Sequence, residues 1–155
     1  MASDSLCFKT KIVHYSNIDI YGLIKEIPKF FKAYHYDFWE KGHAEKPDGV
    51  GHTIDSEWNA VRDINDYLRF KISLRVWVRD LRKVVFESGE STYYGKITIF
   101  LKGEMTKDYK DTLKSKDIIK KLYERYVRKQ EIDDYEDKLA DECVDFTLTL
   151  RSFFR

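Results

Sequence analysis

The residues best suited to metal or acid–base chemistry lie within one short stretch of the sequence. Three of the four histidines alternate there with carboxylates, in the order His35, Asp37, Glu40, His43, Glu45 and His52. Imidazole and carboxylate groups bind transition metals, but these spacings match no metal-binding signature. Residues 41–51 also contain one proline and three glycines, which predicts a solvated loop. We therefore predict no metal site in this stretch.

Other reactive groups also have non-catalytic explanations. The paired carboxylates Asp63/Asp66 and Asp133/Asp134 suit a turn and the start of a helix, respectively. No serine or cysteine lies in a nucleophile motif, and no glycine-rich loop is present to hold a phosphate. The only cysteines, Cys7 and Cys143, are far apart in sequence and are predicted to be reduced thiols. We predict a non-catalytic protein without a cofactor.

A further group of residues combines cations with aromatic rings. From Tyr67 to Arg79 an apolar side chain occupies every second position, which predicts a strand with one buried and one exposed face. Together with a strand over residues 93–105, it would present an outer face formed by Tyr67, Arg69, Lys71, Arg75, Trp77, Arg79, Lys96, Phe100 and Lys102. We predict that this face binds a protein partner or a second copy of the chain, because Trp, Phe and Arg commonly anchor interfaces.

Two other interpretations of the outer face stay open. Cations interleaved with aromatics on a sheet can bind RNA by contacting phosphates and stacking on bases. Alternatively, the face is simply solvated, and its cations pair across strands with Asp55 and Glu57. The 28 basic and 27 acidic residues nearly cancel, which argues against nucleic-acid binding through bulk charge. Any basic site must therefore be local.

The interior gives a third hypothesis for function. Helical stripes rich in Phe and Tyr can fill a core, which is the default, or line an apolar pocket. In a pocket, Phe146 and Leu150 would form walls, and the chain would carry or sense an apolar small molecule. The pocket would also receive tyrosine hydroxyls from Tyr34, Tyr94, Tyr123, Tyr126 and Tyr135.

These groups must be positioned by the elements of a single domain, residues 1–155. A strand is predicted over residues 6–15. Ser16 is the predicted N-cap of a helical region whose apolar stripe ends at Phe38. Pro28 lies inside this region and predicts either two helices or one kinked helix.

An antiparallel meander should follow, with strands at residues 53–62, 67–86 and 93–105. A turn over residues 62–67 would pair Ile54 with Leu74 and Trp58 with Phe70. After Arg79 the alternation fails, and a β-bulge near Asp80–Leu81 would return Val84 and Phe86 to the core.

Two helices should close the chain. The first starts at Lys116, and a switch from basic to acidic residues near Gln130 predicts the boundary between them. The second carries an apolar stripe formed by Tyr135, Leu139, Cys143, Phe146, Leu150 and Phe153. Its segment 144–150 also alternates like a strand, but the helical period fits the whole region better. The predicted fold is α+β, in the order β-α-α-β-β-β-α-α, with helices covering one face of an antiparallel sheet.

Two resemblances accompany this pattern. The run DINDYLRFKISLRVWVRDLRKVVFE followed by GKITIFLKGEMTKDYKD resembles small uncharacterised conserved proteins of archaeal genomes, through Asp66-Tyr67, Trp77 and Asp108-Tyr109. It covers roughly residues 52–150 and implies a cytosolic setting but no activity. The order of elements resembles helix-grip (START-like) domains, in which a curved sheet wraps a long C-terminal helix around an apolar cavity. The sequence contains no apolar stretch of membrane-span or signal-peptide length, so we predict a cytoplasmic protein without a membrane partner.

Overall fold

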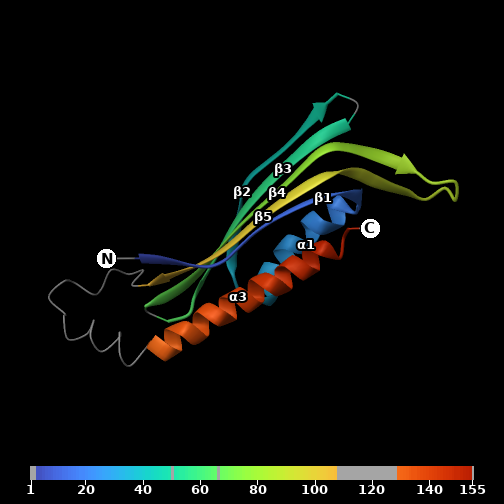
Figure 1. The fold of residues 1–155 in the computed structure, drawn as a ribbon. Coiled ribbons are helices and arrows are strands. Elements are labelled where there is room, and N and C mark those ends of the chain that lie inside the picture. Colours follow the sequence, from blue (N-terminus) through green and yellow to red (C-terminus); the bar gives the residue numbers. More distant parts are fainter. Residues whose placement is uncertain (1–2, 50, 66, 108–128, 155) are drawn as a thin grey trace.

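One antiparallel sheet dominates the computed structural model, which describes residues 3–49, 51–65, 67–107 and 129–154. Its strands are β1 (Ser3–Ile18), β2 (Asp37–Asp48), β3 (Gly51–Asp63), β4 (Leu68–Val85) and β5 (Ser91–Lys107). They lie in the order β1-β5-β4-β3-β2, so the first strand pairs with the last. Helices α1 (Ile20–Ala33) and α3 (Lys129–Arg151) cover the same face of the sheet (Figure 1). The predicted α+β class is confirmed.

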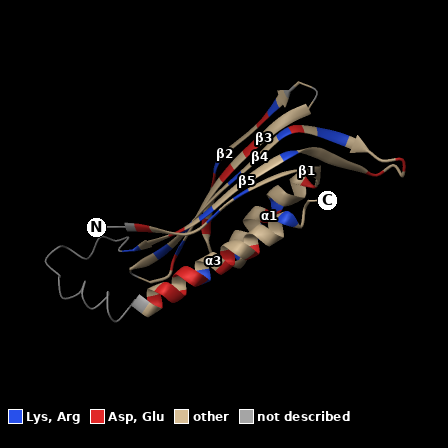
Figure 2. Ribbon diagram, viewed as in Figure 1, with Lys and Arg blue, Asp and Glu red and all other residues tan. Residues whose placement is uncertain are grey.

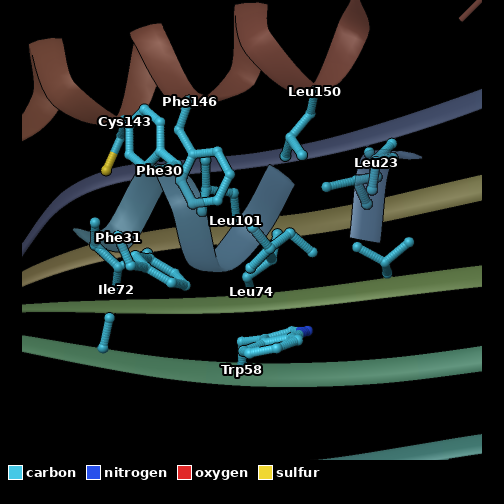
Figure 3. Packing of buried hydrophobic residues seen from close by; sticks show 14 of the residues in the cluster. Leu23, Phe30, Phe31, Trp58, Ile72, Leu74, Leu101, Cys143, Phe146 and Leu150 are labelled. Atoms are coloured by element: carbon cyan, nitrogen blue, oxygen red, sulfur yellow. The ribbon is translucent and has the colours of Figure 1, made fainter. Parts of the chain in front are cut away.

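The core lies between the sheet and the two helices. Every second side chain of β4 is buried there: Leu68, Phe70, Ile72, Leu74, Val76 and Val78. The ring of Phe146 on α3 stacks on that of Phe30 on α1, with centroids 4.0 Å apart, and meets Phe31 edge-on at 5.3 Å. Figure 3 shows the rings of Phe30 and Phe146 between α3 and the sheet residues Leu74 and Leu101. The opposite face of the sheet, called the outer face below, carries the alternate side chains.

Residues 144–150 are helical, as the longer period predicted. The apolar residues of α3 that are buried against the sheet and α1 are Leu139, Cys143, Phe146 and Leu150. Close approach of α3 depends on Gly103 of β5, because a Cβ at that position would lie 2.7 Å from Sγ of Cys143. The predicted helix from Lys116 lies outside the described residues, as do Asp66, Asp108 and Tyr109.

The prediction was wrong for residues 37–48, which form the edge strand β2 rather than a helix end and a loop. Pairing with β3, from Asp37 opposite Val61 to Asp48 opposite Gly51, satisfies this backbone and overrides its weak strand propensity. Gly42 follows a bulge, and Gly49 makes the hairpin turn with φ +60°. Pro47 is tolerated because an edge strand leaves N–H groups unpaired.

The region around α1 also differs from the prediction. Asp19, not Ser16, is the N-cap, and its carboxylate accepts a hydrogen bond from Gly22 N at 3.2 Å. The assigned helix continues through Pro28 to Ala33 as one element. His35 then adopts a left-handed backbone conformation, with φ 62°, and the chain turns into β2.

The predicted β3–β4 register was wrong by four residues. Ile54 pairs with Val78 and Trp58 with Leu74, because the turn is centred two residues further along the chain than predicted, which places Asp63 opposite Arg69. Oδ1 of Asn65 closes this turn by accepting hydrogen bonds at 2.8 Å from the backbone N–H groups of residues 67 and 68. An even shift keeps every side chain on its predicted face.

The bulge after Arg79 is confirmed, with a register shift between Arg79 and Arg82 and a φ of 53° at Asp80. Its effect differs from the prediction: it buries Leu81, whereas Val84 is only half-buried and Phe86 is 42% exposed. The β4–β5 hairpin extends past the helices here, so no element covers its end (Figure 1).

Candidate functional site

The structure brings together nearly all of the predicted outer-face residues. On β4 they alternate with the buried series, and strand pairing places Phe100 beside Arg75 and Lys96 beside Arg79. Tyr67 is the exception, because it lies in the turn before β4 and packs against the core. The outer face is therefore formed by Arg69, Lys71, Arg75, Trp77, Arg79, Lys96, Phe100 and Lys102, with further residues of β1, β2 and β3.

A groove of about 560 Å³ crosses this face. Its outward-pointing lining residues are Lys9, Lys11, Lys41, Glu57, Asn59, Ser73, Arg75, Phe100 and Lys102. The groove exists because one row across the sheet places the short side chains Ser73 and Asn59 next to each other. The rows on either side carry longer side chains. Sequence reasoning missed Lys9 and Lys11, because only the pairing of β1 with β5 brings them here.

Acidic neighbours neutralise the cations on the β3 side of the groove. Arg75 donates to both carboxylate oxygens of Asp55, with Nε–Oδ1 at 3.0 Å and Nη2–Oδ2 at 2.9 Å. These hydrogen bonds are the main cause that raises the pKa of Arg75. Glu57 lies 3.8 Å from the same guanidinium and 3.8 Å from Nζ of Lys41. The pairing that the solvated interpretation predicted is present on this side.

On the β1 side only some cations are paired: Nζ of Lys102 lies 2.6 Å from Glu104, and Nζ of Lys71 lies 3.8 Å from Asp4 of β1. The other cations, here called the cationic strip, are Lys9, Lys11, Arg79 and Lys96. Within the described residues, no Asp or Glu lies within ion-pair distance of any of them. Aromatic rings replace carboxylates as their neighbours: Nζ of Lys11 lies 5.5 Å from the centroid of Phe100, and the Arg79 guanidinium lies 4.3 Å from that of Trp77. The outer face thus has a local excess of positive charge despite the balanced total.

The histidines are not gathered into one site. His43 Nδ1 lies 3.6 Å from Glu40, and His52 Nε2 lies 3.2 Å from Glu45. No group of three or more His, Cys, Asp or Glu side chains within the described ranges is placed to hold a metal ion.

A buried polar cluster is the feature that sequence reasoning missed. Glu142 of α3 accepts a hydrogen bond of 2.7 Å from the hydroxyl of Tyr36 and lies 3.0 Å from Nη2 of Arg62. Burial, followed by the charge of Glu142, raises the pKa of Tyr36, so the phenol stays a neutral donor. The sequence did contain an indication of this cluster, because Glu142 is a charged residue within the apolar stripe of α3, between Leu139 and Phe146.

The two cysteines are free thiols. Burial raises the pKa of Cys7 to about 11 and that of Cys143 to about 12. Both are therefore protonated near neutral pH and are poor nucleophiles.

No protein-family model matches the chain, and no curated protein matches it. No helix in the described part of the chain is long and apolar enough to cross a membrane. Asp and Glu side chains concentrate on the first half of α3, in the helical layer, whereas Lys and Arg recur across the sheet (Figure 2). The function is therefore inferred from the chemistry of these surfaces.

Proposed function

We propose that the chain is a non-catalytic binding domain that holds an acidic segment of a partner protein on the outer face of its sheet. One observation carries this function: a groove of about 560 Å³ is lined by Lys9 and Lys11, which have no carboxylate partner among the described residues. Carboxylates of a partner would pair with these cations as Asp55 pairs with Arg75 and Glu104 with Lys102. The aromatic rings supply apolar contact area beside them.

An RNA ligand has less support. Base recognition on a sheet requires aromatic faces on which bases can stack. Here a cation already lies over three of the outward rings, with Lys11 over Phe100, Lys96 over Tyr15 and Arg79 over Trp77. A base would have to displace the cation that its phosphate also needs.

The carrier hypothesis also has less support. Phe146 and Leu150 are fully buried, and Phe146 stacks directly on Phe30. Tyr94, which was expected to supply a hydroxyl to an interior pocket, is 44% exposed. These side chains behave as a packed core at the positions where the cavity walls were expected.

The proposal is tested with a fluorescently labelled decaglutamate peptide, whose anisotropy reports binding to the full chain. We expect saturable binding that weakens with salt, because the contacts are between exposed charges. The double substitution Lys9→Glu/Lys11→Glu should weaken it by about tenfold or more. A matched control, Lys25→Glu/Lys29→Glu, makes the same charge change on exposed positions of α1 and should bind nearly as well as the wild type.

Other outcomes identify other occupants. Tighter binding of labelled oligouridylate than of decaglutamate would favour RNA. Salt-sensitive dimers in sedimentation, lost in Lys9→Glu/Lys11→Glu, would identify a second copy of the chain as the partner. Equal loss of decaglutamate binding in both charge-reversal pairs would contradict a site on the outer face.

A further inference from the structure

A second cleft lies on the helical face of the sheet, away from the cationic strip. It has a volume of about 450 Å³ and is lined by Tyr21, Glu45, Lys46, Pro47, Gly51, His52 and Tyr93. These residues come from the first turn of α1, from the β2–β3 hairpin and from the start of β5. Glu45 pairs with Ile54, whose side chain is in the core, so Glu45 also points to the helical face. Strand alternation sends the side chain of Lys46 to the other face.

Glu45 is held in one orientation by two neighbours. Its Oε1 accepts a hydrogen bond of 2.9 Å from the hydroxyl of Tyr21 and lies 3.2 Å from Nε2 of His52. Burial and the hydrogen bond to Glu45 raise the pKa of Tyr21 to about 12, so the phenol remains a donor at neutral pH. No described residue hydrogen-bonds the second oxygen, Oε2. The orientation of this carboxylate is therefore fixed before a ligand binds, and Oε2 accepts no hydrogen bond from a described residue, which lowers the cost of binding a ligand there.

Two aromatic rings stand beside this carboxylate. The rings of Tyr21 and Tyr93 are 5.3 Å apart between centroids and inclined at 73°, so they form two walls of the cleft. A ring face attracts a cation, and a carboxylate makes a charge-assisted hydrogen bond to an ammonium group. An anionic ligand would instead meet the negative charge of Glu45.

The exposure of the three polar groups distinguishes a site from a structural network. The side chains of Glu45 and His52 are 40% and 30% exposed, and Tyr21 is 38% exposed. The purely structural cluster around Glu142, by contrast, is buried. We propose that this cleft binds a small organic ammonium ion, with Glu45 as its counter-ion and Tyr21 and Tyr93 as aromatic walls. This site is independent of the function proposed for the outer face.

The test uses n-butylammonium chloride, with n-butanol as a neutral probe of similar size, in ¹H–¹⁵N NMR titrations of the full chain. We expect saturable shifts at residues 21, 45, 52 and 93 with the ammonium ion and none with the alcohol. Glu45→Gln keeps an acceptor for Tyr21 but loses the charge, and should bind about tenfold more weakly or worse. The matched control is Glu40→Gln, because Glu40 also faces a histidine, His43 at 3.6 Å, but does not line this cleft. It should leave the titration unchanged.

Three results would overturn the proposal: equal affinity in Glu45→Gln, equal shifts with n-butanol, or shifts confined to the acidic first half of α3. If the Glu45→Gln spectrum shows a general change of fold, Tyr93→Leu gives a second test. It removes one ring wall and keeps the carboxylate, so it should also weaken binding. Retention of full affinity in that variant would equally contradict the site.

Discussion

The hydroxyl of Tyr36, just before β2, donates a hydrogen bond of 2.7 Å to the carboxylate of Glu142 in the middle of α3. Arg62, at the end of β3, lies 3.0 Å from the other oxygen of that carboxylate and donates to the carbonyl oxygen of Tyr34 at 2.6 Å. The cluster thus joins the end of α1, the sheet and α3 inside the protein. Its geometry fixes where α3 lies along the sheet, because each partner comes from a different element.

Breaking this cluster should be costly. In Arg62→Met the carboxylate of Glu142 would keep, among the described residues, only the Tyr36 hydroxyl as a partner, so we expect a loss of roughly 3 kcal/mol or more in urea unfolding. Arg62→Met/Glu142→Gln removes the buried charge but keeps an acceptor for Tyr36, and should recover a large part of that loss. If the double variant loses as much stability as Arg62→Met and Glu142→Gln lose separately, added together, Arg62 and Glu142 do not interact.

The spacing between α3 and β5 should be sensitive to one methyl group. In Gly103→Ala the new Cβ would lie 2.7 Å from Sγ of Cys143 and 3.5 Å from Cγ of Leu139, so the Cys143 side chain or the helix that carries it must shift. We expect thermal unfolding to show a loss of about 1–3 kcal/mol. Gly103→Ala/Cys143→Ala should regain part of it, whereas Gly42→Ala, whose Cβ has no atom within 4 Å, is the steric control. A neutral Gly103→Ala would contradict the close helix approach.

The free energy of unfolding should fall in alkaline solution. Cys7 and Cys143 have folded pKa values of about 11 and about 12, above the ordinary value of 9.0. Because these thiols are harder to ionise in the folded state, their contribution to the free energy of unfolding is complete below pH 9. It is lost as pH rises through the folded pKa values. Urea unfolding between pH 8 and 11 should show the decline, and Cys143→Ala should show less of it. An identical slope in that variant would mean that the thiol does not contribute.

Truncation of Phe146 distinguishes a packed core from a ligand-binding cavity. Phe146→Ala would remove the ring that stacks on Phe30, so we expect a loss of about 3–5 kcal/mol and no change in bound molecules. Native mass spectrometry of protein purified from its own host measures any bound compound. An apolar compound present in the wild type and absent in Phe146→Ala would instead support the carrier hypothesis.

The faces of the strands were predictable from the sequence, whereas their partners were not. The alternation along β4 has a period of two, so it assigns Ile72 inward and Arg75 outward under any even register. For the same reason it could not detect the shift of four residues that places Arg75 beside Glu57. Edge strand β2 was missed because Gly42 and Pro47 are typical of loops, and only pairing with β3 makes it a strand.

The candidate site was therefore only half visible in the sequence. The β4 and β5 residues were selected correctly for the outer face, but which of the β4 cations have a carboxylate partner on a neighbouring strand depends on long-range pairing. Lys9 and Lys11 enter the groove only because β1, at the start of the chain, lies beside β5. Glu45 and His52 looked like loop residues until the β2–β3 hairpin brought them together opposite Tyr21.

Asp55 should act as an internal competitor for the acidic ligand proposed for the outer face. It holds the Arg75 guanidinium by two hydrogen bonds, and Arg75 lines the groove. In Asp55→Asn the competing charge is absent, so we expect decaglutamate to bind up to about fivefold more tightly at low salt, within the range of an exposed ion pair. The gain should shrink as salt rises, because both charges are partly exposed.

Asp63→Asn is the control, because its partner Arg69 does not line the groove. Unchanged affinity in Asp55→Asn, or the same gain in Asp63→Asn, would show that Arg75 does not contact the ligand.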